Sequence, residues 1–182
     1  MIGAGSCVIT PTAPAGGIYS ATTGNATTIT ILKATQSALS ITSATSATYN
    51  GSSYTFSPLT STGGSGTGAV TYSATAGSTN PATGCSVTGT TLTATSSGTC
   101  TVTVTQAADN NYLVATASVT FTFNKATQSA LSITSATSAS YNGSAYTFSP
   151  LTSTGGSGTG AVTYSATAPV PEPPVEVSGE NV

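Results

Sequence analysis

The chain has 182 residues, enough for one or two domains, and only 3% of them are charged. With two lysines, no arginine and no histidine, it lacks both the basic surface of a nucleic-acid-binding protein and the usual acid–base residues of an enzyme. Three of its four carboxylates, Glu172, Glu176 and Glu180, lie close to the C-terminus, so the acidic pI of about 4.4 is a local property of that segment.

The sequence predicts neither a membrane-spanning helix nor an N-terminal secretory signal. No run of about 18 apolar residues is present, so we expect no membrane-spanning helix. The first residues, MIGAGSC, lack the basic and long apolar regions of a secretory signal. If the protein is exported, as its composition suggests, we expect a signal that has been removed or a chain that is part of a longer one.

Apolar residues recur with a period of two along the chain. Cys100, Val102 and Val104 alternate with threonines, and Phe121 and Phe123 do the same. This alternation predicts strands with one apolar face and one hydroxylated face. Threonine suits the outer face because it is β-branched and still hydrates. The sequence therefore predicts an all-β protein.

Residues 1–32 align with the second half of a longer repeat. Cys7 falls on Cys100 at an offset of 100 − 7 = 93 residues. After a slip of one residue, Ile29 falls on Phe121 at an offset of 121 − 29 = 92. We interpret residues 1–32 as the C-terminal part of a divergent repeat.

Residues 33–124 form the one uninterrupted copy. Its signals include Asn50-Gly51, which predicts a β-hairpin because both residues accept positive φ, and the glycine-rich turn 62–68. About seven short strands with frequent turn residues indicate an immunoglobulin-like β-sandwich.

The segment 33–76 returns almost unchanged at residues 125–168, an offset of 125 − 33 = 92. The two segments differ only at Thr48 against Ser140 and at Ser53 against Ala145. Residues 125–168 are therefore the N-terminal part of a second repeat. Residues 169–182 are a Pro-rich acidic tail, either a linker or a divergent strand that completes a repeat with residues 1–32.

Three segments make a family resemblance specific: GGSGTGAVTYSATAG, GCSVTGTTLTATSSGTCTVTV and QAADNNYLVATASVTFTF. They resemble the bacterial immunoglobulin-like tandem repeats of large surface and secreted proteins. The resemblance covers the complete copy and pieces of both partial copies. It implies immunoglobulin-like β-sandwich repeats used as a stalk or spacer, sometimes in adhesins, and it implies no catalytic residues.

Cys85 and Cys100 are the candidate disulfide pair, and they enclose a loop of 100 − 85 = 15 residues. If the neighbouring strands formed one flat meander, the two cysteines would lie too far apart to bond. The bridge therefore requires the strand that holds Cys100 to cross to the opposite sheet. The alternative is two buried free thiols. Cys7 is left over, either as a buried thiol or for an intermolecular bridge.

Two other polar clusters have ordinary structural interpretations. Asp109-Asn110-Asn111 could be a calcium loop, but one carboxylate with two amides is a poor site for a hard cation, and such residues commonly form turns. A lysine beside Asn124 could form an isopeptide crosslink if a buried acid lay next to it. We instead expect Lys33 and Lys125 to be charged residues at domain junctions.

Carbohydrate could be attached to the chain at glycosylation motifs or bound by a face of aromatic residues. Asn25, Asn50 and Asn142 fit the glycosylation pattern, which arises easily in a Thr/Ser-rich chain. A sugar-binding face would require exposed aromatic residues. The tyrosines that could line such a face are Tyr19, Tyr54, Tyr72 and Tyr112, and alternation predicts that most of them lie in the core.

These observations predict a non-enzymatic structural module of an extracellular or cell-surface stalk, adhesin or fibre, with no cofactor and no metal. A half-sandwich alone exposes apolar faces and strand edges, so we expect residues 125–182 to pair head-to-tail with residues 1–32 of another chain. Closure within one chain is an alternative. The other functional alternatives are an adhesion module that binds carbohydrate or a host surface, and a passive spacer of an exported enzyme.

Overall fold

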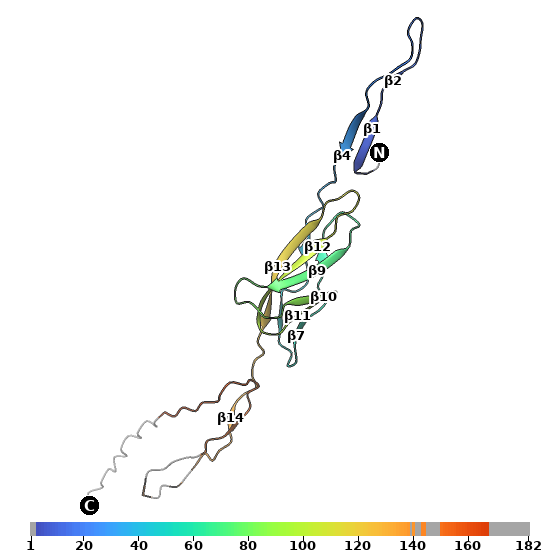
Figure 1. The fold of residues 1–182 in the computed structure, drawn as a ribbon. Helices are drawn as coiled ribbons and strands as arrows, with labels where there is room; N and C mark the ends of the chain where they lie inside the picture. The colour runs from blue at the N-terminus through green and yellow to red at the C-terminus, as the bar shows by residue number, and fades with distance from the viewer. Residues whose placement is uncertain (1–2, 139, 141–142, 145–149, 168–182) are drawn as a thin grey trace, which may run out of the picture. The chain divides into compact units, whose positions relative to one another are not determined.

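The computed structural model describes residues 3–138, 140, 143–144 and 150–167. These residues form strands, bends and turns, and none of them is helical (Figure 1). The chain divides into two compact units, residues 1–126 and residues 127–182. The prediction of an all-β protein is confirmed for the described residues.

The first unit contains β1 to β13 and the second contains β14 and β15. The bounds are β1 Gly5–Ile9, β2 Thr12–Ala13, β3 Thr22–Thr23, β4 Thr27–Ile31, β5 Ser40–Ile41, β6 Ser46–Thr48, β7 Tyr54–Phe56, β8 Ser61–Thr62, β9 Val70–Ala76, β10 Ser86–Thr88, β11 Thr91–Ala94, β12 Gly98–Gln106, β13 Ala115–Asn124, β14 Ser132–Ile133 and β15 Ser153–Thr154.

Residues 33–124 build a β-sandwich from a four-stranded sheet, in the order β6-β13-β12-β9, and a three-stranded sheet, in the order β10-β11-β7. Strands β12 and β13 are the longest, and they pair antiparallel along their whole length. Their alternating Thr and apolar residues place one apolar row towards the three-stranded sheet. The buried core therefore joins the two sheets: Leu59, Ala82, Leu92, Ala94, Cys100, Val102, Phe121 and Phe123.

The Asn50-Gly51 turn does not make the predicted hairpin. Strand β6 before it pairs parallel with β13, whereas β7 after it pairs with β11 in the other sheet. The Asn50 Oδ1 atom accepts hydrogen bonds from the backbone N–H groups of Ser52 and Ser53, and Gly51 has a φ of 94°. The local turn chemistry is therefore as expected, but the turn leads from one sheet to the other, because the flanking strands find longer-range partners.

Residues 5–31 form one long hairpin in two pieces, β1 with β4 and β2 with β3. Its register repeats that of β12 with β13: Cys7 lies opposite Ile29 as Cys100 lies opposite Phe121. Pro11 interrupts the ladder, since proline has no N–H to donate, but its carbonyl still accepts a hydrogen bond from Gly24 N at 2.9 Å. We call residues 5–31 the head hairpin.

In the second unit, β14 and β15 pair antiparallel with Ser132 opposite Thr154. The same pairing holds 92 residues earlier, where Ser40 lies opposite Thr62 in β5 and β8. Other local bonds also recur: Gly156 N donates to Ser129 O at 3.1 Å, as Gly64 N donates to Ser37 O at 3.2 Å. We call residues 127–167, insofar as the structure describes them, the tail half. The predicted strand in the Pro-rich tail, residues 169–182, lies outside the described residues.

Candidate functional sites: a disulfide, a loop cluster and two open half-repeats

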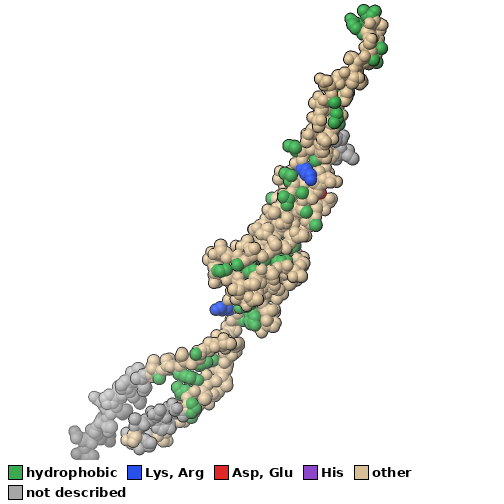
Figure 2. Space-filling model, viewed as in Figure 1, with side chains coloured by type: hydrophobic (Ala, Val, Ile, Leu, Met, Phe, Trp, Pro, Cys, Tyr) green, Lys and Arg blue, Asp and Glu red, His purple; other side chains and the backbone are tan. Residues whose placement is uncertain are grey.

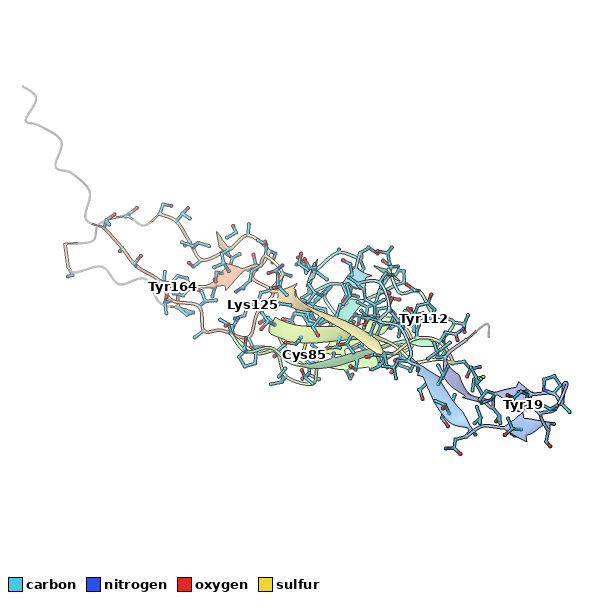
Figure 3. All side chains as sticks on the ribbon, turned by 90° about the horizontal axis from the view of Figure 1, so that it is seen from above. Tyr19, Cys85, Tyr112, Lys125 and Tyr164 are labelled. Carbon is cyan, nitrogen blue, oxygen red and sulfur yellow. A yellow bond between two sulfur atoms is a disulfide. The ribbon has the colours of Figure 1, made fainter. Side chains whose placement is uncertain are left out.

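Cys85 and Cys100 form a disulfide with a Cα–Cα distance of 5.9 Å. Cys100 lies in β12 of the four-stranded sheet, and Cys85 immediately precedes β10 of the three-stranded sheet. This is the crossing that the bridge was expected to require. Because Cys100 is fully buried against Phe121, the bridge ties the two sheets together at the core. Figure 3 labels Cys85 beside these strands.

Cys7 is a free, half-buried thiol in β1. It occupies the register position that Cys100 holds in the complete copy.

Gln36 joins the first half of the complete copy to its second half. Its Nε2 donates to the carbonyl of Leu113 at 2.7 Å and to those of Ala107 and Gln106 at 3.3 and 3.5 Å. Its Oε1 accepts from the backbone N–H groups of the loop at residues 65–66, both at 3.2 Å. Only 6% of Gln36 is exposed, so these bonds are largely shielded from water.

Gln106 extends the same cluster. Its Nε2 donates to the carbonyl of Gly66 at 2.7 Å, and its side chain lies where a Cβ on Gly64 would otherwise be. Gly64 has a φ of 77°, so both its backbone conformation and the close approach of Gln106 require glycine. Neither glutamine was predicted from the sequence to have a structural role. The available signal was that Gln36, Gln106 and Gln128 are the only glutamines in the sequence, and that two of them occupy the same repeat position.

Asp109 holds two loops together through both oxygens of its carboxylate. Its Oδ1 accepts from the backbone N–H groups of Asn111 and Tyr112 at 2.8 Å, and its Oδ2 accepts from Thr67 N at 2.7 Å. The hydrogen bond from Thr67 N, with those from Asn111 and Tyr112, lowers the pKa of the carboxyl of the half-buried residue Asp109. Within the described residues no three His, Cys, Asp or Glu side chains gather as a metal site would need.

The two junction lysines lie at opposite ends of the complete copy. Lys33 Nζ donates to the backbone carbonyl of Asp109 at 2.6 Å, near the start of β13. Lys125 follows Asn124, which ends β13. The Asp109 side chain therefore does not lie beside the Asn124–Lys125 pair, and Asp109 is the only carboxylate residue among those that the structure describes.

The head hairpin exposes the face that is the core of the complete copy. Ile29 and Ile31 are 47% and 44% exposed, whereas Phe121 and Phe123, at the equivalent positions, are each 1% exposed. Ile9, on the same face, is 50% exposed. Figure 2, in the same view as Figure 1, shows apolar side chains on the surface of this hairpin.

The tail half also exposes apolar residues whose counterparts in the complete copy are buried. Leu131 and Leu151 are 59% and 43% exposed, but their counterparts in the complete copy, Leu39 and Leu59, are 9% and 2% exposed. Beside Leu131 the structure is hollowed by an open cavity of about 210 Å³. The head hairpin and the tail half thus both expose side chains whose counterparts in the complete copy are buried.

The tyrosines do not form one face. Tyr54 and Tyr72 are half-buried and pack against the core, and Tyr112 is also half-buried. Tyr19 is 77% exposed in the loop of the head hairpin, where Figure 3 labels it. The prediction that most of these tyrosines lie in the core holds only in part, because Tyr19 and Tyr112 lie outside the named strands.

The glycosylation motifs differ in their surroundings. Asn25 is exposed, and Asn50 uses its side-chain oxygen in the turn described above. Asn142 lies outside the described residues. The described part of the chain also holds no apolar helix of membrane-spanning length.

Comparison of the chain with protein-family models, with curated protein sequences and with solved structures finds no match.

Proposed function

We propose that this chain is a non-enzymatic structural module of an extracellular stalk, adhesin or fibre, made of immunoglobulin-like repeats and extended by pairing of its open half-repeats. One observation carries the proposal. The head hairpin and the tail half keep the strand registers of the two halves of a complete repeat, yet each exposes the apolar residues that the complete repeat buries.

The complete copy supplies the geometry of the pairing. There β9, from the first half, pairs antiparallel with β12, from the second half, and Ala74 lies opposite Val102. The equivalent residues are Ala166 in the tail half (166 − 74 = 92) and Ile9 in the head hairpin (102 − 9 = 93). We therefore expect residues 162–167 of one chain to pair antiparallel with residues 8–13 of a second copy, with Ala166 opposite Ile9.

The energetic reason is the burial of apolar surface and the covering of strand edges. Fully burying an isoleucine or leucine side chain contributes about 1.5–3 kcal/mol relative to leaving it exposed. Ile9, Ile29 and Ile31 on the head hairpin, and Leu131 and Leu151 on the tail half, are each about half exposed. Pairing would bury all five and would satisfy edges that otherwise favour non-specific aggregation.

The pairing uses two different surfaces, so a chain that is bound through its tail half still offers its head hairpin to a further copy. A head-to-tail contact of this kind adds one chain after another. The disulfide and the low content of charged residues support placing the module outside the cytosol.

Light scattering on the purified 182-residue chain over a range of concentrations tests the proposal. We expect the average mass to rise with concentration, and electron microscopy to show particles that lengthen in one direction. The Ile29→Asp variant should abolish growth because it places a charge on the apolar face. The Thr28→Asp variant adds the same charge on the opposite face of β4 and should grow normally. A monomer at all concentrations, or equal behaviour of the two variants, contradicts the proposal.

A further inference from the structure

The side chain of Gln36 makes hydrogen bonds with both halves of the complete copy. Its Oε1 accepts hydrogen bonds within the first half, and its Nε2 donates to carbonyls at residues 106, 107 and 113 of the second half. A single buried amide therefore fixes the position of one half relative to the other.

Gln128 occupies the equivalent position in the tail half, where only the hydrogen bonds to its side-chain oxygen are formed. Its Oε1 accepts from Ser157 N and Gly158 N at 3.3 and 3.2 Å, as Gln36 Oε1 does from residues 65–66. Among the residues that the structure describes, its Nε2 has no acceptor. Gln128 is exposed, whereas Gln36 is buried. The tail half thus holds an oriented amide whose donor side faces no partner.

The head hairpin carries carbonyls at the matching positions. Subtracting 93 from 106, 107 and 113 gives Ala13, Pro14 and Ser20. The loop between them repeats one backbone hydrogen bond of the complete copy. Tyr19 O accepts from Gly16 N at 3.1 Å, as Tyr112 O accepts from Asp109 N at 3.1 Å.

We propose that Gln128 is the specificity-determining contact through which the tail half binds a second copy. Its amide donates to the backbone carbonyls of Ala13, Pro14 and Ser20 in the head-hairpin loop. This inference rests on the proposed pairing of half-repeats. Recognition through carbonyls explains how a hairpin whose side chains have diverged, with Gly16 in place of Asp109, can still fit. The amide also selects one register, because a hairpin shifted along the tail half would leave a buried donor without an acceptor.

A discrete complex makes the contact measurable. A chain with Ile29→Asp keeps an intact tail half but a disabled head hairpin, and a chain with Leu131→Asp has the reverse. Neither variant should polymerise alone, and the mixture should form a 1:1 complex whose Kd is measured by calorimetry. Absence of this complex overturns both the pairing and the role of Gln128.

The test of the inference adds Gln128→Glu to the Ile29→Asp chain. Glutamate keeps an acceptor for Ser157 N and Gly158 N but replaces the donor with an anionic oxygen facing carbonyls. We expect Kd to rise at least about tenfold, the equivalent of one lost hydrogen bond. The control, Thr127→Glu, puts the same charge on an exposed neighbour and should change Kd less than about threefold. A complex that forms with unchanged Kd in Gln128→Glu overturns the inference while leaving the pairing intact.

A second measurement does not require the Gln128→Glu substitution, and so does not depend on how well a chain with that substitution folds. In the complex of the two Asp variants that retain Gln128, the side-chain NH2 protons of Gln128 should be protected from exchange with solvent. They should exchange freely in the isolated tail-donating chain. Equal exchange in the free and bound chains overturns the inference.

Discussion

Removal of the Cys85–Cys100 disulfide should destabilise the complete copy strongly. The bridge closes a loop with a sequence separation of 15 residues. In the loop-entropy estimate, such a closure lowers the entropy of the unfolded chain enough to contribute about 3 kcal/mol. For a domain of 60–100 residues, a loss of 3 kcal/mol lowers the melting temperature by roughly 12–24 °C. We therefore expect a shift of this size in the double variant Cys85→Ala/Cys100→Ala.

Calorimetry, with circular dichroism at the same heating rate, measures the shift. Reducing the wild-type chain removes the loop constraint but leaves both sulfur atoms in place, whereas the alanine variant also removes a sulfur atom from the fully buried Cys100 position. The variant should therefore unfold at or below the temperature of the reduced wild type. Cys7→Ser serves as the control, because Cys7 makes no disulfide.

Two results would refute this reasoning. If the double variant melts within a few degrees of the oxidised wild type, the bridge does not constrain the unfolded chain as the estimate assumes. If Cys7→Ser lowers the melting temperature as much as the double variant does, the stabilising bond is not the one between Cys85 and Cys100.

Three further predictions concern the loops and the pairing. Acid should destabilise the first unit as the pH falls through the lowered folded-state pKa of Asp109. The ionised carboxyl contributes stability that is fully present above its unfolded-state pKa and is lost when the carboxyl is protonated. Asp109→Asn should therefore reduce the dependence of the unfolding free energy on pH in acid unfolding curves, and an unchanged pH dependence contradicts this role of Asp109. Ala13→Gln should tighten the head–tail complex a few-fold in calorimetry, because a glutamine at this position can reach a carbonyl of the tail half as Gln106 reaches Gly66, and a weaker complex argues against the proposed register. In a Cys7→Ser chain, Ile9→Cys with Ala166→Cys should give disulfide-linked ladders on non-reducing gels under mild oxidation, whereas crosslinked monomers would indicate closure within one chain and no crosslink would refute the register.

Much of the architecture follows from the sequence because strands have a simple period. The alternation through Cys100–Val104 and Val119–Phe123 predicted β12, β13 and the buried row between the sheets, and both strands occur as expected. Cys85 and Cys100 were the candidate disulfide pair, on the condition that the strand holding Cys100 lies in the opposite sheet, and the structure contains both the disulfide and this arrangement.

Strand partners and side-chain hydrogen bonds did not follow from the sequence. Asn50-Gly51 has the composition of a hairpin turn, but its flanking strands pair with β13 and β11, segments far away along the chain. The role of Gln36 depends on carbonyls about 70 residues away, and no local pattern marks which carbonyls a glutamine amide will meet. Such contacts depend on how distant backbone segments come together.

The sequence alone predicted an all-β chain, showed that the segment 33–76 returns at residues 125–168, and led us to interpret residues 1–32 as part of a further repeat. This is because alternation and self-similarity are local properties of a chain. Only the tertiary structure decided which apolar residues of the head hairpin and the tail half are exposed to solvent. Ile29 and Phe121 hold the same register position, but Phe121 is buried by strands from the other half of its repeat and Ile29 is not. The burial of a side chain depends on which distant segments pack against its strand, and the sequence of the strand itself does not specify those segments.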